Sequence, residues 1–104
     1  MDFGQLFKQA QDMQRKLERI ESELKDRVVE GTASGGLVKV YVSGTLQVKG
    51  IEIDKEAVDP EDVEALEDLV LVAVRDAVKQ AQEMAEESKK AVTGGLAGPL
   101  GGLL

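Results

Sequence analysis

Apolar side chains recur every three or four residues along the first quarter of the chain, and this spacing constrains the fold more than any other feature. The positions that follow it are Phe3, Leu6, Ala10, Met13, Leu17, Ile20 and Leu24. We call these seven residues the apolar seam. A strict alternation of three and four over about three heptads predicts one long α-helix over residues 2–26. Because the seam is as narrow as that of a coiled coil, this helix is expected to project and to pack along one other helix.

The helical spacing ends near Arg27, where a segment rich in valine and glycine begins. Its composition predicts three antiparallel strands with turns at residues 34–36 and 43–44, since glycine reaches the positive φ angles that tight hairpins need. In the second strand, alternate residues belong to opposite faces, with Val38, Val40 and Val42 on one and Leu37, Lys39 and Tyr41 on the other. In the third strand the alternation slips at residues 49–50. This slip predicts a β-bulge that turns the apolar residues on both sides of it toward the same core.

A second helix is predicted to begin at Asp59-Pro60, because Asp is a favoured N-cap and Pro fits the first helical position. Apolar residues at helical spacing extend it to about Val92, with a buried first half and a polar, projecting segment at residues 80–90. The sequence therefore predicts a single α+β domain over residues 1–92 in the order α-β-β-β-α. Residues 93–104 are rich in glycine and leucine without periodicity, which predicts a disordered tail whose leucines offer a docking point for a partner.

Composition limits the chemistry available to the chain. It contains no cysteine and no histidine, which removes disulfides, thiolate metal sites, the usual general base and the commonest metal ligand. No nucleophile is paired with a base, and no glycine loop has phosphate-binding spacing, so we expect neither an enzyme nor a bound cofactor or metal. We find no signal-peptide pattern, and no stretch approaches the ~18 apolar residues of a membrane span. With only three aromatic residues the core is modest, which favours its completion by a second copy.

The net charge of −7 is unevenly distributed along the chain. Residues 1–30 contain six basic and seven acidic groups, whereas residues 54–92 contain five basic and twelve acidic groups. A negative protein is repelled by DNA at long range, so any DNA-binding surface is expected on the first helix. Such binding would be weak, poorly selective and sensitive to salt.

Four segments in order along the chain resemble the YbaB/EbfC family of nucleoid-associated proteins: KQAQDMQRKLERIESEL, GLVKVYVSG, IEID and EDVEALEDLVLVAVRDAVKQAQE. The resemblance covers essentially the whole chain up to the tail, and none of the segments is a catalytic motif. It implies a homodimer with a central body of sheets and second helices, from which helical arms protrude like tweezers to hold duplex DNA. It also implies a cytoplasmic, nucleoid-associated location and, for some members, a link to replication, recombination and repair.

The best basic stripe in the chain lies on the first predicted helix. Lys8, Arg15 and Arg19 align on one side of it at about 100° per residue, with Lys16 beside them. On a DNA-binding arm these side chains would contact phosphates along the backbone. The alternative interpretation is a set of solvated charges in i,i+4 ion pairs with neighbouring carboxylates.

Other charged residues have simpler interpretations. Lys89 and Lys90 end the second helix, where cations satisfy terminal carbonyls, although in a clamp they would also lie near its opening and contact DNA. Lys39 and Lys49 are predicted to be edge lysines that discourage sheet-to-sheet aggregation. The acidic run at residues 59–68 is explained by helix capping and solvation, because a hard cation usually needs a loop that wraps it.

Two functions of different classes follow. The first is a homodimer that binds duplex DNA through backbone phosphates with little sequence specificity. The second is a protein-interaction adaptor in replication, recombination or repair, in which the apolar seam and the tail recruit partners and DNA contact is incidental.

Overall fold

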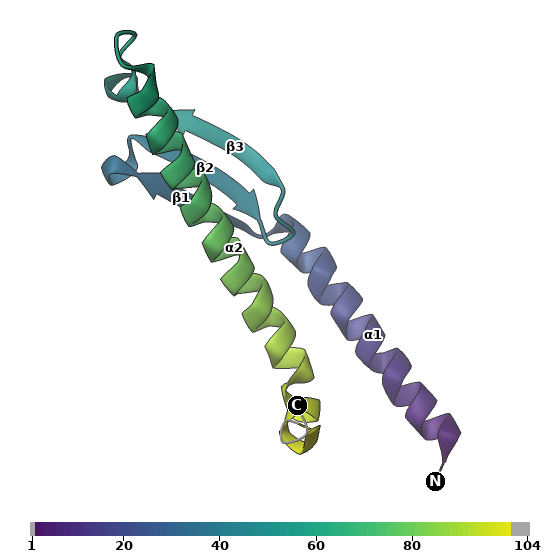
Figure 1. Cartoon of the computed structure of the whole chain (residues 1–104). Coiled ribbons are helices and arrows are strands. Elements are labelled where there is room, and N and C mark those ends of the chain that lie inside the picture. Colours follow the sequence, from purple (N-terminus) through teal and green to yellow (C-terminus); the bar gives the residue numbers. More distant parts are fainter. Residues whose placement is uncertain (1, 101–104) are drawn as a thin grey trace.

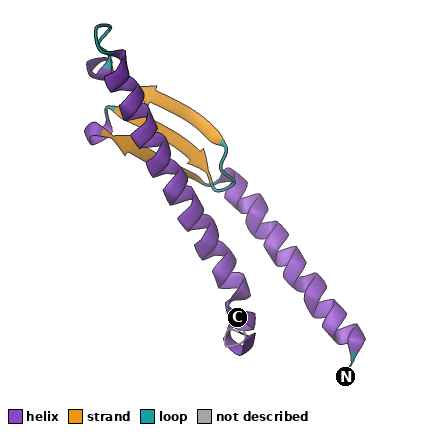
Figure 2. Cartoon of the chain, in the orientation of Figure 1, coloured by secondary structure: helices purple, strands orange, loops and turns teal. Residues whose placement is uncertain are grey.

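The computed structural model describes the backbone of residues 2–100 and the side chains of residues 2–92. One long helix lies across a three-stranded sheet, and a second long helix extends from the end of that sheet, as Figure 1 and Figure 2 show. The elements are α1 (Phe3–Asp26), β1 (Val28–Ala33), η1 (Ser34–Gly36), β2 (Val38–Ser43), β3 (Val48–Ile53), η2 (Lys55–Ala57) and α2 (Val63–Leu100). The predicted α-β-β-β-α order is confirmed. The molecule measures 71 × 27 × 17 Å, because α1 and the second half of α2 extend beyond the sheet as two arms.

The strands form an antiparallel sheet in the order β1-β2-β3. The predicted inner face of β2 is confirmed, since its three valines at positions 38, 40 and 42 are fully buried. Along β3 the register shifts, so that Tyr41 pairs with Gly50 while Val42 pairs with Val48. Lys49 is therefore the extra residue, and the predicted bulge is confirmed.

The helix α2 lies directly on β1 and β2, and a glycine makes this close approach possible. A Cβ atom at Gly31 would lie 2.3 Å from both the carbonyl oxygen of Ala73 and the amide nitrogen of Ala77. On the helix side the contact is made by alanines at positions 73, 77 and 81, which are all fully buried. Small side chains on both partners thus let the backbones of α2 and β1 meet.

Side chains of α2 also cover the outer edge of β1. The N–H of Thr32 donates to Oδ2 of Asp76 (2.9 Å), and Nε2 of Gln80 donates to the carbonyl oxygen of Glu30 (2.9 Å). The hydrogen bond from Thr32 and a second one from Gln80 lower the pKa of Asp76, although desolvation opposes them. These edge groups are therefore satisfied within the chain and do not template a further strand.

The predicted start of the second helix is wrong by one turn. α2 begins at Val63, because the side chain of Asp62 is its cap and accepts the N–H of Ala65 at 3.2 Å. The residues at Asp59-Pro60 instead form a preceding turn, in which Oδ1 of Asp59 accepts the N–H of Glu61 at 3.0 Å. Both aspartates are good N-caps, and the one nearer the apolar run caps the helix.

The two predicted turns use glycine for different reasons. In the turn at residues 34–36, Gly35 and Gly36 have φ angles of 67° and 97°, as expected. In the loop after β2, the residue with a positive φ angle is Leu46, at 65°. The prediction that Gly44 is present to adopt a positive φ angle is therefore wrong. The N–H of Gly44 donates to the carbonyl oxygen of Leu24 at 2.9 Å, and a Cβ atom there would lie 2.8 Å from the Leu24 side chain. Gly44 thus lets the loop anchor the end of α1.

The helix α2 extends past the predicted end near Val92, since its backbone is helical to Leu100. The side chains of residues 93–100 are not described, and residues 101–104 lie outside the described part of the chain. The disordered tail over residues 93–104 therefore stays a prediction.

Candidate nucleic-acid interface

The basic stripe lies on the α1 arm and faces solvent. Lys8, Arg15, Lys16 and Arg19 are all exposed. The Arg15 side chain is 76% exposed, and its Nη1 atom lies 3.9 Å from Oδ1 of Asp12. Within the described part of α1 this is the one ion pair no longer than 4.0 Å, so the i,i+4 pairs of the alternative interpretation are not formed there. A phosphate can therefore approach these cations without breaking a strong ion pair.

The stripe and the apolar seam occupy opposite sides of α1. At about 100° per residue, Arg15 lies about 20° from Lys8 around the helix axis, whereas Leu17 lies about 180° from it. The seam faces α2, because Leu24 is 2% exposed and the three seam residues before it are half-buried. Lys16 lies about 80° from Lys8, on the flank of the stripe. The stripe therefore points away from α2.

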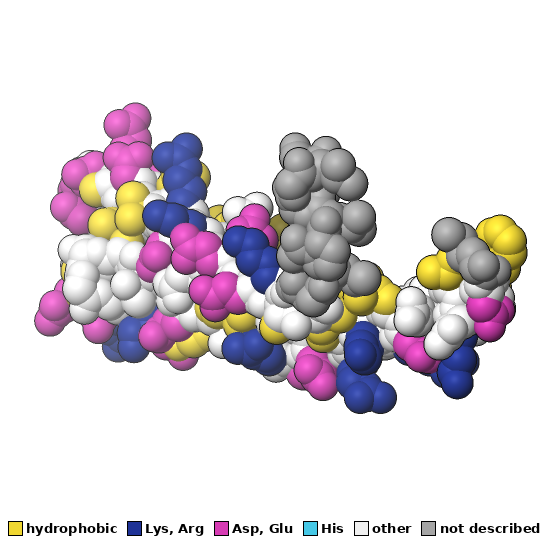
Figure 3. Space-filling model, turned by 90° about the horizontal axis from the view of Figure 1, so that it is seen from below, with side chains coloured by type: hydrophobic (Ala, Val, Ile, Leu, Met, Phe, Trp, Pro, Cys, Tyr) yellow, Lys and Arg dark blue, Asp and Glu magenta, His cyan; other side chains and the backbone are white. Residues whose placement is uncertain are grey.

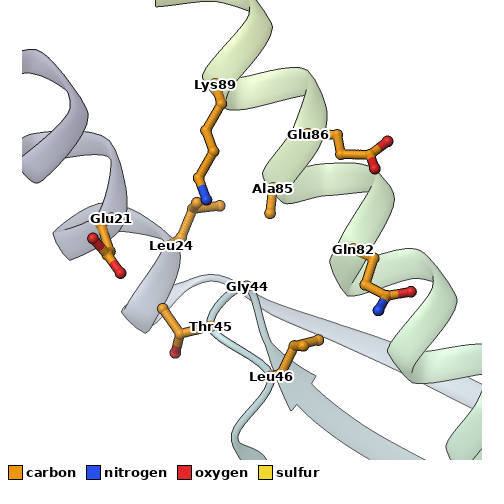
Figure 4. A pocket seen from close by; sticks show the side chains of 9 residues that line it. All are labelled: Glu21, Leu24, Gly44, Thr45, Leu46, Gln82, Ala85, Glu86 and Lys89. Atoms are coloured by element: carbon orange, nitrogen blue, oxygen red, sulfur yellow. The ribbon is translucent and has the colours of Figure 1, made fainter. Parts of the chain in front are cut away.

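Lys89 lies in a different part of the molecule. It lines a cavity of about 450 Å³ between the end of α1, the loop after β2 and α2. Figure 4 shows its side chain extending from α2 toward Leu24, with Glu21 and Glu86 also lining the cavity. Lys90 follows it on α2 and is exposed. Within one protomer the structure thus groups the four α1 cations and places Lys89 on the seam side of α1, away from them.

A hydrogen bond that the sequence did not predict joins the two arms close to the sheet. Nη1 of Arg27 donates to Oγ of Ser88 at 3.4 Å. These residues are far apart in the chain, and no local pattern links them. The contact links the two arms at their base.

On the outer face of the sheet, two carboxylates surround the single tyrosine, and Lys39 lies beside one of them. The hydroxyl of Tyr41 lies 3.2 Å from Oε1 of Glu30 and 3.1 Å from Oε2 of Glu52. Partial removal from water, together with the hydrogen bond to Glu52 and the charges of both glutamates, raises the pKa of Tyr41 to about 12. Lys39 lies in the central strand β2, with its Nζ atom 3.7 Å from Oε1 of Glu30, so the prediction that Lys39 is an edge lysine is wrong. Lys49 does lie on the edge strand β3. The face thus carries two carboxylates and one paired cation, and it lacks the row of unpaired cations that α1 presents.

The net charge of the chain is localised in one segment. Residues 54–68 contain eight acidic groups and one basic group, a net charge of −7, which leaves the remainder of the chain with a net charge of zero. This segment includes η2 and the start of α2, at the end of the molecule opposite the arm tips (Figure 1). In Figure 3 the Asp and Glu side chains crowd the left end of the molecule. The stripe and the acidic segment are therefore separated along the long axis.

The acidic segment does not form a recognisable metal site. Among the described residues, no three acidic side chains are grouped so that they could hold a metal ion.

None of the helices in the described part of the chain is both long and apolar enough to cross a membrane.

Comparison with known proteins identifies the family. Residues 1–96 match the YbaB/EbfC DNA-binding family. The chain belongs to this family. A nucleoid-associated protein of Chloroflexus aurantiacus is 48% identical to this YbaB/EbfC chain over 98 residues, which cover 94% of this chain and 98% of that protein. Another, from Rhodococcus erythropolis, is 48% identical over 102 residues, which cover 98% of this chain and 91% of that protein.

The YbaB/EbfC chain is also similar to a solved structure. The crystal structure of an uncharacterized protein from Helicobacter pylori superposes with a TM-score of 0.74 at 28% sequence identity. The match covers 84% of this chain and 91% of the other. The resemblance seen in the sequence segments is confirmed.

Proposed function

We propose that this YbaB/EbfC protein is nucleoid-associated and binds duplex DNA as a homodimer, mainly through phosphate contacts with little sequence specificity. The observation that carries the proposal is the exposed stripe of Lys8, Arg15 and Arg19 on the side of α1 that faces away from α2. Long cationic side chains at this spacing suit successive phosphates, and such contacts carry no direct sequence information. Lys16 widens the stripe, and Lys89 and Lys90 add cations on the second arm.

The proposed second copy would complete the core. Each valine on the inner face of β2 has a direct partner on β3, and directly opposed residues share a face of the sheet. The pairs are Val38 with Ile53, Val40 with Ile51 and Val42 with Val48. The β2 members are fully buried, whereas Ile53, Ile51 and Val48 are 43%, 50% and 58% exposed. Because α2 packs on β1 and β2, the β3 part of this apolar face remains open to solvent.

The first half of α2, which packs on the sheet, carries a further exposed apolar surface. A groove of about 450 Å³ is lined by Leu66, Glu67, Val70, Leu71 and Val74. Leu71 and Val72 are 46% and 52% exposed. Exposed apolar surfaces of this kind mark protein interfaces. A dimer formed here would carry two stripes, so that two weak DNA contacts act together.

The charge distribution explains how an acidic chain binds DNA in this proposal. Phosphate repulsion comes mainly from residues 54–68, at the far end from the arm tips. The Debye length is about 8–10 Å at 0.1–0.15 M salt, much shorter than the long dimension of the molecule, 71 Å. The stripe is therefore screened from most of the acidic segment.

The test combines charge reversal with a salt titration. The wild-type chain is titrated on a short random-sequence duplex at ~50 and ~200 mM salt, the range in which phosphate contacts lose most of their affinity. We expect binding at the lower salt that collapses at the higher. The double variant R15E/R19E is expected to lose binding while its mass in solution remains that of a dimer. The matched control K49E/K55E makes the same change in net charge on β3 and η2 and is expected to retain binding.

The outcomes separate the parts of the proposal. Equal loss of binding in both double variants would mean that net charge, and not the stripe, controls DNA affinity. A monomeric wild-type chain would remove the homodimer. No DNA binding by the wild-type chain at either salt would favour the adaptor function instead.

A further inference from the structure

Within the part of the chain whose side chains are described, the apolar seam of α1 is increasingly exposed toward the tip of the arm. Near the sheet the seam is covered, since Leu24 is 2% exposed. Toward the N-terminus, Leu6 is 48% exposed, and Phe3, on the first turn, is 76% exposed. Phe7 widens the strip beside the seam and is 67% exposed. In Figure 3, hydrophobic side chains stand exposed at the right-hand end of the molecule, around the N-terminus.

The pattern of the seam indicates the kind of partner it fits. The spacing of three and four residues that packs the base of α1 against α2 continues without interruption to Phe3. Such spacing is complementary to another helix. Contact of the two phenylalanines with DNA bases is less suitable, because Lys8, the nearest cationic side chain of α1, lies about 140° from Phe3 and about 100° from Phe7 around the helix axis. When DNA is bound to the stripe, the part of the seam at the arm tip would therefore face away from the DNA.

The area at the tip decides how stable such a contact can be. A fully buried phenylalanine covers roughly 150–250 Å², so Phe3 and Phe7 at their exposed fractions present roughly 200–350 Å² per arm. Two tips together would bury roughly 400–700 Å² of aromatic surface, which is below the ~1,200 Å² at the lower end of stable interfaces. Tip pairing is therefore too weak to form an oligomer in solution. It becomes effective where neighbouring molecules are held close together, as on one DNA duplex.

We infer that the arm tips of neighbouring molecules pair with each other on DNA, through Phe3, Leu6 and Phe7 of one α1 and the same residues of a second copy, so that the protein coats DNA cooperatively. The inference rests on the proposed DNA-binding function. It adds a contact between dimers that leaves the stripe available, because the seam and the stripe lie on opposite sides of α1.

The double variant F3A/F7A tests the inference by comparing two duplex lengths. Alanine retains helix propensity, so α1 is expected to form. On a duplex that admits a single dimer, the affinity of the variant is expected to stay within about twofold of the wild type. On a long duplex, the wild type is expected to bind with a Hill coefficient above one, and the variant with a coefficient of about one and a half-saturation concentration raised about five- to tenfold. The control Q5A/Q9A changes exposed residues that lie about 120–160° from the two phenylalanines around the same turns, and it is expected to behave like the wild type.

Site-specific crosslinking identifies the occupant of the seam. The chain has no cysteine, so A10C introduces one thiol in the seam. Crosslinked chain pairs are expected on the long duplex and not on the short one or in the absence of DNA. Equal crosslinking in all three samples would mean that the arms of a single dimer meet, which would overturn the inference.

The failure of the inference is distinguishable from that of the proposed function. A wild-type chain that binds the long duplex without cooperativity, or an F3A/F7A variant that keeps full cooperativity, would overturn tip pairing alone. A wild-type chain that binds neither duplex would remove the proposed function and tip pairing with it.

Discussion

Replacement of Gly31 by alanine tests the closest packing contact in the protein. The added Cβ atom would lie 2.3 Å from backbone atoms of Ala73 and Ala77, whereas ordinary contacts begin near 3.4 Å. Because these atoms belong to the backbone of α2, no side-chain rotation relieves the overlap, and the helix must move outward by about 1 Å. The same movement lengthens the hydrogen bonds that hold the edge of β1 to Asp76 and Gln80.

The expected loss of stability follows from these two effects. Overpacking of a tight contact costs about 1–3 kcal/mol, and each weakened hydrogen bond costs about 0.5–1.5 kcal/mol. The lower backbone entropy of alanine in the unfolded chain offsets about 0.4–1 kcal/mol. We therefore expect Gly31→Ala to lower the free energy of unfolding by about 2–4 kcal/mol, or the midpoint of thermal unfolding by roughly 10–25 °C for a domain of this size.

The assay is thermal unfolding followed by circular dichroism, at one fixed protein concentration because dimerisation makes the midpoint depend on concentration. Gly50→Ala is the matched control, since a Cβ atom there would lie 3.6 Å from its nearest neighbour, Cδ2 of Tyr41, and its φ is not positive. We expect it to change the free energy of unfolding by less than about 1 kcal/mol. A Gly31→Ala protein as stable as the Gly50→Ala protein would refute the argument that backbone contact sets the position of α2.

Two further predictions concern titratable groups. Asp76→Asn is expected to lower the free energy of unfolding at pH 7 by about 1 kcal/mol, because the hydrogen bond from Thr32 would end on a neutral acceptor. The pKa of Asp76 is lowered in the folded state, so its stabilisation is complete above the unfolded value of about 3.9 and is lost as the pH falls through the folded value. Urea unfolding of wild type and variant should therefore converge below about pH 4, and a constant difference down to the lowest pH would contradict this. For Tyr41, the single tyrosine, absorbance titration of the folded chain is expected to give a pKa of about 12 that falls in Glu52→Gln. The stabilisation from the neutral phenol is present below the unfolded pKa of about 10 and is lost as the pH rises toward 12; a folded-state midpoint near 10, with the circular dichroism spectrum unchanged, would contradict the assignment.

Local patterns in the sequence were sufficient for the order of elements. The period of side-chain burial is a property of each element, so the seam of α1, the alternating valines of β2 and the slip at Lys49 could be read from neighbouring residues. The basic stripe on α1 was predicted in the same way, because residues seven and eleven positions apart lie on one side of any α-helix.

Contacts between distant residues were decided only by the tertiary structure. The sequence predicted a turn at Gly44 and gave no role to Gly31. Only the packing of α2 on β1, and of the loop after β2 on the end of α1, shows why each position is a glycine. Two hydrogen bonds likewise join segments that no local pattern connects. One links Arg27 to Ser88, and the other links the β1 edge, at Thr32, to Asp76.

The orientation of the stripe also required the tertiary structure. The sequence placed three cations on one side of a helix, and α2 determined which side of that helix is covered. Helical periodicity determines relative angles within one element, whereas the direction in which a face points depends on what packs against the opposite face. For this reason the sequence by itself determined the elements and the stripe, and only the packing of α2 placed the stripe on the outside of the arm.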